Sequence, residues 1–195
     1  MEHHELPTGT VLAGGKSSRL GRDKCALVLG GADMLTRTVH LLRKIVPEVA
    51  VIGREHPGAI TVFDEVPGAG PVGAITTALR HARGPCLVLP CDLPFMRHQT
   101  LALLLEAWKK KRPDTLVTAF RHSGTGKKEN LVAVYEPGAL AFLEPKLQQN
   151  LLKIALIVPE ECCTFVPVPP EAEEDFFNIN RPEDLRETER RLSMP

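Results

Sequence analysis

Short apolar segments alternate with stretches of helical periodicity along most of this chain. Residues 49–52 and 86–89 are typical of buried strands, and in 34–46 apolar residues such as Leu35 and Val39 recur at helical spacing. Strands that alternate with helices form mostly parallel sheets covered by helices. The sequence therefore predicts an α/β fold. Its strands are expected over 10–13, 49–52, 60–63, 86–89, 116–120, 131–135, 165–168 and 176–179, and its helices over 34–46, 72–82, 97–111, 137–144, 148–155 and 181–192.

Length and charge narrow the class of protein further. With 195 residues, 43% of them hydrophobic, the chain has the size and composition of one globular domain, and we expect residues 1–195 to form one. Residues 1–8 are expected to be a disordered tail. The 24 basic and 24 acidic residues cancel, which argues against a non-specific binder of nucleic acid or of anionic membranes. The sequence shows neither a membrane span nor a signal peptide, so it predicts a cytoplasmic protein.

The cysteines predict no special chemistry. There are five, at positions 25, 86, 91, 162 and 163, and no two are spaced as C-x-x-C. An odd number without such spacing argues against a disulfide framework or a zinc site. We expect ordinary reduced thiols.

A glycine-rich, basic loop follows the first expected strand. Gly14 and Gly15 are followed by Lys16, Arg19 and Lys24. Glycines let the backbone approach a ligand closely, and lysine and arginine side chains after them suit a polyphosphate. A glycine turn followed by a solvated basic loop explains the composition equally well.

A second glycine pattern competes with the first. Residues 68–73 (GAGPVG) match G-x-G-x-x-G between a strand and a helix, with Asp92 further along the chain. This is the pattern of a dinucleotide-binding turn. Pro71 counts against it, because that turn should offer backbone N–H groups to a pyrophosphate.

Two aspartates follow expected strands. Asp92 lies between Pro90 and Pro94 in PCDLP, and Asp64 follows the strand at 60–63. In open α/β sheets ligands bind outside the carboxyl ends of the strands, and a carboxylate there suits Mg²⁺. The alternative is that Asp92 caps the next helix.

Two asparagines lie near the last expected helix. On a strand over 176–179, Asn178 and Asn180 would share a face. Asn180 could instead be the N-cap of the helix, with Glu183 completing a capping box.

Together these segments resemble the molybdenum cofactor guanylyltransferase (MobA) family, within the nucleotide-sugar-transferase-like nucleotidyltransferases. The resemblance covers nearly the whole chain and is most specific at LAGGKSSRLGRDK (12–24), GPVGAI (70–75), PCDLP (90–94) and FFNINRPEDL (176–185). It implies a single three-layer α/β/α domain with a mostly parallel central sheet. It also implies transfer of GMP from GTP to the molybdopterin cofactor with release of pyrophosphate. The residues LAGG, rather than LAAG, favour the guanylyl branch over the cytidylyl branch.

The resemblance also assigns roles to residues. It implies that Leu12, Ala13 and Gly14 hold the guanine base, that Gly15, Arg19 and Lys24 cradle the triphosphate, that Asp64 and Gly70 bind the nucleotide, and that Asp92 binds Mg²⁺. Asn180 would line the same site, and Asn178 and Asn180 would either contact the acceptor or support the residues that bind the ligands. Phosphoryl transfer needs charge neutralisation more than a nucleophile, so Lys24, Arg19 and Asp92 are the expected catalytic residues.

The implied partners are GTP, the molybdopterin cofactor and proteins that deliver or accept it, with no nucleic acid and no membrane. Among the departures from the family pattern, Ala74 bears on approach to the nucleotide, whereas Asn130 and Arg181 bear on the acceptor.

Three other functions stay open. One is a nucleotidyltransferase that uses CTP with molybdopterin, or a sugar phosphate as acceptor. Another is an NAD(P)-dependent oxidoreductase, as residues 68–73 indicate. The third is a non-catalytic nucleotide-binding relative.

Overall fold

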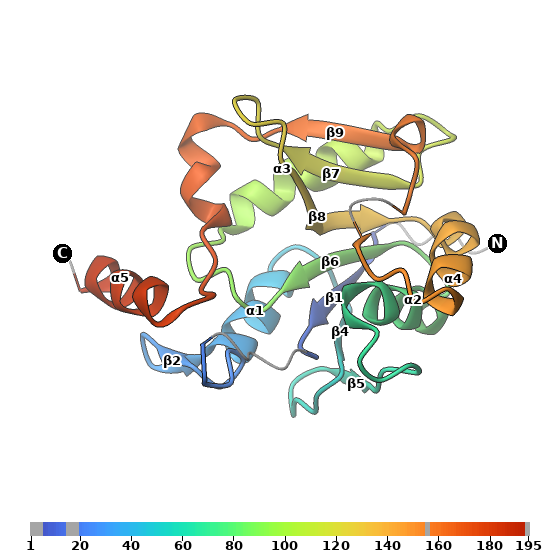
Figure 1. Cartoon of the computed structure of the whole chain (residues 1–195). Helices are drawn as coiled ribbons and strands as arrows, with labels where there is room; N and C mark the ends of the chain where they lie inside the picture. Colours follow the sequence, from blue (N-terminus) through green and yellow to red (C-terminus); the bar gives the residue numbers. More distant parts are fainter. Residues whose placement is uncertain (1–5, 15–19, 155–156, 194–195) are drawn as a thin grey trace.

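A seven-stranded sheet forms the centre of the computed structural model, which describes residues 6–14, 20–154 and 157–193 (Figure 1). The strand order is β5-β4-β1-β6-β8-β7-β9, and β8 alone in this sheet runs antiparallel to its neighbours. The predicted mostly parallel sheet is confirmed. Its strands are β1 (Thr8–Leu12), β4 (Val49–Ile52), β5 (Ile60–Val62), β6 (Cys86–Pro90), β7 (Val117–Arg121), β8 (Lys128–Tyr135) and β9 (Cys163–Pro167).

The direction of β8 follows from the length of its connection to β7. Only residues 122–127 separate the two strands. A connection this short joins antiparallel strands, whereas parallel neighbours need a crossover of a dozen or more residues. The carboxyl ends of the other six strands therefore lie at one edge of the sheet, together with the start of β8.

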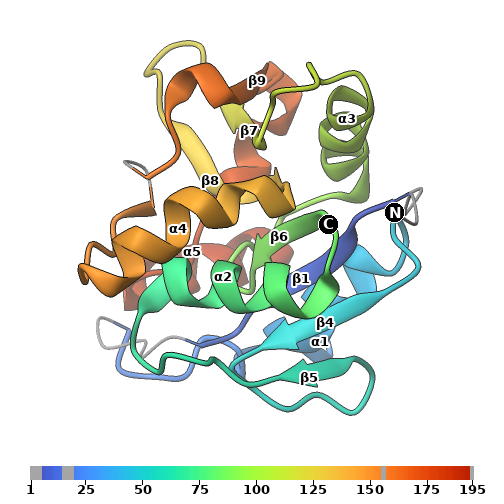
Figure 2. The ribbon, with the colours of Figure 1, turned by 90° about the vertical axis from the view of Figure 1, so that its right-hand side faces the viewer.

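Helices cover both faces of the sheet and give the expected three layers (Figure 2). The helices α1 (Met34–Leu42) and α3 (His98–Lys109) pack on one face, and α2 (Gly70–Ala82) and α4 (Leu140–Gln148) pack side by side on the other. On α1, Leu35, Val39 and Leu42 are all buried against β1 and β4. The helical spacing seen in the sequence thus marks the face that the sheet covers.

A small third core lies beside the main sheet. The short hairpin of β2 (Val28–Leu29) and β3 (Ala32–Asp33) packs with the last helix, α5 (Pro182–Leu192), around Leu27, Met34 and Ile179. The sequence analysis did not find this hairpin, because two-residue strands are too short to show an alternating pattern. The core brings the segment before α5 close to the chain that follows β1.

Two expected elements are wrong. No strand forms over 176–179, where the 3₁₀ helix η4 (Pro170–Phe176) leads into irregular chain. The ring of Phe176 packs edge-on against Phe120 of β7, at 5.2 Å between centroids. The other wrong element is the helix expected over 148–155. In the described residues of that range no α-helix continues, because α4 ends at Gln148 and Asn150 has a φ of +56°, which ends helical geometry. Further 3₁₀ helices include η1 (Pro137–Ala139) and η3 (Glu160–Cys162).

The amino-terminal boundary also differs from expectation. Thr8 opens β1, and its N–H donates to the carbonyl of Pro85 at 2.9 Å, so residue 8 lies in the sheet and not in the expected tail. Residues 1–5 lie outside the described part. Among the described residues, no helix combines the length and the apolar character that crossing a membrane requires.

The start of α3 depends on a residue far along the chain. Arg97, at its N-cap, provides no side-chain cap. The buried carboxylate of Asp175 takes over that role: it accepts from the backbone N–H of Arg97 at 3.3 Å and from the hydroxyl of Thr100, and it forms an ion pair with the Arg97 guanidinium at 2.7 Å. Because Asp175 lies in η4, this contact fixes the segment that follows β9 against the start of α3.

Candidate active site

The ends of two neighbouring strands bring the predicted charged residues together. β1 leads into Gly14, and β6, which pairs with β1, leads into Asp92. The ammonium of Lys24 contacts Asp92 Oδ2 at 3.0 Å and Asn180 Oδ1 at 2.6 Å. The side chains of Lys24 and Asp92 are only 17% and 18% exposed. The structure therefore joins Lys24, Asp92 and Asn180, which the sequence placed in three separate motifs.

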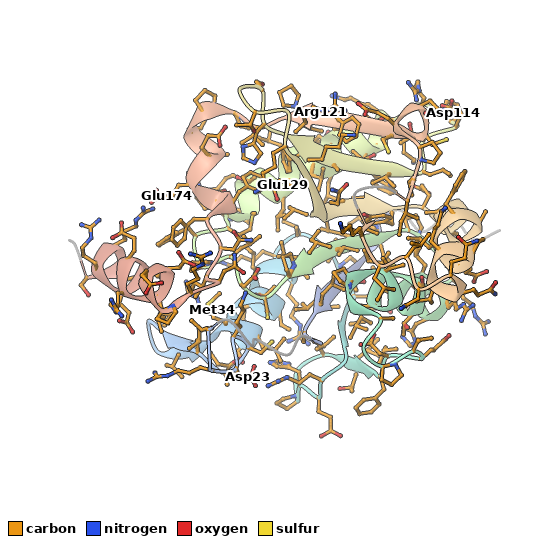
Figure 3. All side chains as sticks on the ribbon, viewed as in Figure 1. Asp23, Met34, Asp114, Arg121, Glu129 and Glu174 are labelled. Atoms are coloured by element: carbon orange, nitrogen blue, oxygen red, sulfur yellow. The ribbon has the colours of Figure 1, made fainter. Side chains whose placement is uncertain are left out.

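Neighbouring groups hold Lys24 in place. Asp23 accepts the backbone N–H of Cys25 at 3.0 Å through Oδ1 and forms an ion pair with Arg54 at 2.5 Å through Oδ2. Arg54 follows β4, so this carboxylate ties the basic loop to a second strand end. Figure 3, in which Asp23 is labelled, shows it at the lower part of this edge of the sheet.

Backbone contacts place Asn180. The N–H of Ile179 donates to the carbonyl of Asp92 at 3.0 Å, and the N–H of Asn180 donates to Asp184 Oδ2 at 2.8 Å. Arg181, and not Asn180, is the N-cap of α5, and Asp184 rather than Glu183 accepts the cap N–H groups. The capping alternative for Asn180 is thus wrong, and its side chain is free to contact Lys24.

Two carboxylate oxygens at this edge are buried without a hydrogen-bond partner among the described residues. They are Asp64 Oδ1, after β5, and Asp92 Oδ1. Burial raises the pKa of Asp64 above its ordinary value, because desolvation disfavours the charged form. Buried polar atoms are normally paired, and an unpaired one in a native structure calls for a missing ligand, ion or water.

Two glycines make room for the Asp64 carboxylate. A Cβ added to Gly14 would lie 2.9 Å from Asp64 Oδ2, and one added to Gly53 would lie 3.3 Å from the same atom and 3.0 Å from Gly14 Cα. Gly53 also has a φ of +86°, which other residues rarely adopt. The strand ends after β1 and β4 are therefore shaped around this carboxylate.

Two adjoining cavities open at these strand ends. The first, of about 190 Å³, lies over β1 and β6, and the second, of about 670 Å³, lies over β4 and β5. They share Ala13, Gly14 and Gly70, and their summed volume falls in the range of small-ligand sites. The first is lined by Leu12, Ala13, Gly14, Lys24, Cys25, Gly70, Pro71, Ala74, Pro90, Cys91, Asp92 and Leu131, and the second by Ala13, Gly14, Gly53, Arg54, Phe63, Asp64, Pro67, Gly68 and Gly70.

Most of the predicted site residues line these cavities. Gly15 and Arg19 lie outside the described residues. Asn178 is half-buried two positions before Asn180, and in the described part of the chain no hydrogen bond links its side chain to the other site residues. Within that part, the residues predicted to bind the nucleotide line the two adjoining cavities, whereas Asn178 lines neither.

Sequence reasoning missed three features of the site. The signal for Gly53 was available, because it follows a buried strand just as Gly14 does. Nothing in the sequence pairs Arg54 with Asp23. Nor does it reveal that the sulfurs of Cys25 and Cys91 lie 2.8 Å apart in the floor of the first cavity.

Comparison with known proteins identifies this arrangement. The model of the MobA-like NTP transferase domain matches residues 9–156, which include every residue that lines the two cavities but not Asn180. The chain belongs to the MobA-like NTP transferase family.

Relatives of known name and structure agree with that assignment. The molybdenum cofactor guanylyltransferase of Rhizobium meliloti is 32% identical, over 96% of this chain and 92% of its own. The crystal structure of molybdopterin-guanine dinucleotide biosynthesis protein A from Archaeoglobus fulgidus is 28% identical, with a TM-score of 0.78 over 95% of this chain and 98% of its own. A Mycobacterium tuberculosis protein solved as a manganese complex, at 15% identity and a TM-score of 0.61 over 94% of this chain and 97% of its own, shares the fold.

Family membership bears on the second glycine pattern. A MobA-like chain is a nucleotidyltransferase and not the NAD(P)-dependent oxidoreductase that residues 68–73 indicated. Gly70 is the first residue of α2, followed by Pro71, and it lines both cavities. Residues of the 68–73 turn thus line the same cavities as Lys24, Asp64 and Asp92.

Proposed function

We propose that this protein transfers GMP from GTP to the molybdenum cofactor, with Mg²⁺ as cofactor and pyrophosphate as the leaving group. One observation carries the proposal: Lys24 and Asp92 contact each other in a cavity that Ala13 and Gly14 after β1 also line, and Lys24 contacts Asn180 as well. The whole chain of residues 1–195 acts as one nucleotidyltransferase domain.

The two cavities suit the two parts of a nucleotide. The segment Leu12–Gly14, Gly70 and Asp64 would hold the guanosine, because the second cavity offers glycine backbone and an unpaired carboxylate oxygen. A carboxylate accepts hydrogen bonds from the N–H groups of guanine or from ribose hydroxyls. The first cavity, which Lys24 and Asp92 line, would then receive the triphosphate, with Gly15 and Arg19 as further phosphate contacts.

The residues present fit a magnesium ion. Asp92 Oδ1 is buried, unpaired among the described residues and next to the cavity. No cluster of three or more histidine, cysteine or acidic side chains suited to a metal occurs in that part of the chain. Mg²⁺ binds through one or two carboxylates together with substrate phosphates and water, so a single aspartate suffices. When bound, the ion would neutralise charge on the phosphates.

The other residues position and neutralise. Lys24 would turn from Asp92 towards the phosphates, and Asn180 would keep the ammonium oriented through its amide oxygen, at 2.6 Å. The protein needs no nucleophile of its own, because the terminal phosphate of the acceptor attacks the α-phosphate of GTP directly. We expect no covalent enzyme intermediate.

The acceptor would enter on the side of Asn180 and Asn178. This segment follows η4 and is joined to the backbone of Asp92 through Ile179. An unstable cofactor favours direct transfer between proteins, so we propose that separate proteins deliver the acceptor and receive the product.

A panel of ligands tests the nucleotide. We would measure thermal shifts with GTP, CTP, ATP, UTP and NAD, each with and without Mg²⁺. Ligand at 100 times its dissociation constant stabilises by about 2.7 kcal/mol, a rise of roughly 5 °C for a chain of this size. A selective shift with GTP that Mg²⁺ enhances supports the proposal and justifies a turnover assay with molybdopterin. A preference for CTP, or a shift with NAD alone, contradicts it.

The variant Lys24→Ala tests the chemistry. Loss of a group that stabilises transition-state charge lowers turnover by about 10²–10³-fold. Pyrophosphate release from GTP and molybdopterin should fall by at least that factor, while the melting curve shows that the variant remains folded. Wild-type turnover in this variant contradicts the proposed role of Lys24.

A further inference from the structure

Two thiol groups that line the first cavity contact each other. Cys25 Sγ and Cys91 Sγ are 2.8 Å apart, although the residues are 66 positions apart in the chain. Both residues line the cavity, and both are otherwise buried, with 5% and 6% exposure. The separation is about 0.8 Å longer than a disulfide bond of about 2.0 Å. Only a small movement is therefore needed to join them.

The remaining cysteines have no such arrangement. Cys86 is fully buried in β6 and donates weakly to the carbonyl of Gly84, at 3.9 Å. Cys162 and Cys163 are partly exposed neighbours at the start of β9, where Cys163 donates to the carbonyl of Pro159 at 3.3 Å. Among the cysteines of the chain, all of which the structure describes, only Cys25 and Cys91 lie within contact distance of each other across the fold.

We propose that Cys25 and Cys91 are a modification site, at which a peroxide forms a reversible disulfide that blocks nucleotide binding. The first thiol reduces the peroxide to one molecule of water and becomes a sulfenic acid. The second thiol then displaces the hydroxyl group as a second water, and the S–S bond forms. The two thiols lose two electrons and two protons in total, and one peroxide accepts both electrons.

The position of the pair explains why the bond opposes nucleotide binding. Cys25 directly follows Lys24, and Cys91 directly precedes Asp92. The Cys25 thiol also donates to the carbonyl of Ala13 at 3.6 Å, in the segment proposed to hold the base. A disulfide removes that donor. It also fixes the spacing between the two backbones from which Lys24 and Asp92 must move when phosphate and metal separate them.

The same position makes the reaction sensitive to occupancy. Both thiols line the cavity, and both residues belong to the buried core that includes side chains of α1 and β1, so we expect peroxide to reach them through the cavity. A bound nucleotide would cover them. This half of the inference rests on the proposed function, whereas formation of the bond does not.

Peptide mapping tests the bond without any assay of activity. The full-length protein without nucleotide would be treated with a small excess of hydrogen peroxide, alkylated and digested without reductant. We expect one crosslinked peptide pair containing Cys25 and Cys91, lost on treatment with dithiothreitol. The variant Cys162→Ser/Cys163→Ser should give the same pair, and Cys25→Ala should not. Peroxide-treated wild type with both thiols free, or with a Cys162–Cys163 product alone, overturns the proposal.

Binding of GTP tests the consequence. Reduced protein serves as the reference, so failure of the reduced protein to bind GTP would count against the proposed function and leave the mapping result untouched. If the reduced protein binds, we expect the oxidised protein to bind at least tenfold more weakly, with recovery after dithiothreitol. GTP·Mg²⁺ added before peroxide should slow formation of the crosslinked pair at least fivefold. Equal affinity in both redox states, or equal rates with and without GTP, overturns the link to nucleotide binding.

Discussion

The two halves of the carboxyl edge of the sheet differ in whether their buried carboxylate oxygens have hydrogen-bond partners. At the ends of β5, β4, β1 and β6, Asp64 and Asp92 each keep one buried oxygen without a hydrogen-bond partner in the described chain. At the ends of β7 and β9 and the start of β8, carboxylates are matched: Glu129, which Figure 3 labels, contacts both His122, at 2.9 Å, and Lys127, at 2.7 Å. Asp175 has three donors around it.

We interpret the half with unpaired carboxylate oxygens as the proposed binding site and the half with paired carboxylates as a structural scaffold. An unpaired buried carboxylate destabilises the folded protein, so it persists where a ligand supplies the missing partner. A saturated cluster already has its partners and stabilises the arrangement of strands and loops. Within the described residues, the second half also has one buried side-chain nitrogen without a partner, Arg121 Nε, but no buried carboxylate oxygen without one.

The largest expected difference between the halves is in turnover. Asp92 and Glu129 have similarly low exposure, 18% and 14% of their side chains, so Asp92→Asn and Glu129→Gln are matched changes. Asp92→Asn should lower turnover by about 10²–10³-fold, because it removes the proposed metal ligand. Glu129→Gln should leave turnover near the wild-type level. Pyrophosphate release measured on both variants decides, and an equal loss in both would remove the distinction between the halves.

The next effect is on stability and belongs to the scaffold half. Asp175→Ala removes the buried carboxylate that caps α3 and pairs with Arg97. The variant loses hydrogen bonds to a charged group and the cap of α3. We therefore expect its free energy of unfolding to be about 2–4 kcal/mol lower than that of the wild type. Its neighbour Glu174, 60% exposed and paired with Arg191, is the control, and Glu174→Ala should cost less than about 1 kcal/mol. Urea denaturation measures both, and similar values for the two variants contradict the argument.

A smaller effect concerns the glycine that makes room for Asp64. In Gly14→Ala the new methyl group would lie 2.9 Å from Asp64 Oδ2, so the carboxylate must move. Loss of one hydrogen bond to a charged group, about 1.5–3 kcal/mol, predicts a KM for GTP raised by about tenfold or more. A methyl group at Gly124, in the loop between β7 and β8, meets open space, so Gly124→Ala should leave KM unchanged. Unchanged KM in the Gly14 variant would place the nucleotide elsewhere.

The smallest effect is on the pH dependence of stability. Desolvation raises the pKa of Asp64 above 3.8 in the folded protein, so the folded state keeps this proton to higher pH than the unfolded state does. The stability of the wild type relative to Asp64→Asn should therefore be greatest at low pH. It should fall as the pH rises above about 3.8 and then level off. Urea denaturation of both proteins between about pH 4 and about pH 7 measures it, and a difference that rises with pH has the wrong sign.

Much of the fold could be predicted because its elements carry local patterns. The strand at 49–52 was placed correctly, and α1 showed its buried face in the spacing of Leu35, Val39 and Leu42. The failures came where tertiary contacts override local pattern. The stretch 176–179 was predicted as a strand from its apolar and polar residues. Phe176 instead lies in η4, where its ring packs against Phe120. The β2–β3 hairpin was too short to be recognised.

The site could be predicted in part, for a different reason. Lys24, Asp92 and Asn180 were found as single residues in separate motifs, and the family resemblance supplied their common role. Their convergence depends on β1 and β6 being neighbours, which no local pattern states. For the same reason, the contact between Cys25 and Cys91 and the ion pair between Arg54 and Asp23 could not be predicted.

The hydrogen bond from Lys24 to Asn180 has a consequence for the order in which the protein becomes active. The two residues are 156 positions apart, and a chain is synthesised and begins to fold from its amino-terminal end. A nascent chain can pair β1 with β4 and β6, and thus place the loop proposed to bind phosphate, well before Asn180 has been added. Until then the ammonium of Lys24 lacks the amide oxygen of Asn180, and Asp92 lacks the backbone contact with Ile179. Catalytic competence is therefore a late event in the life of each molecule, and incomplete chains would consume no nucleotide.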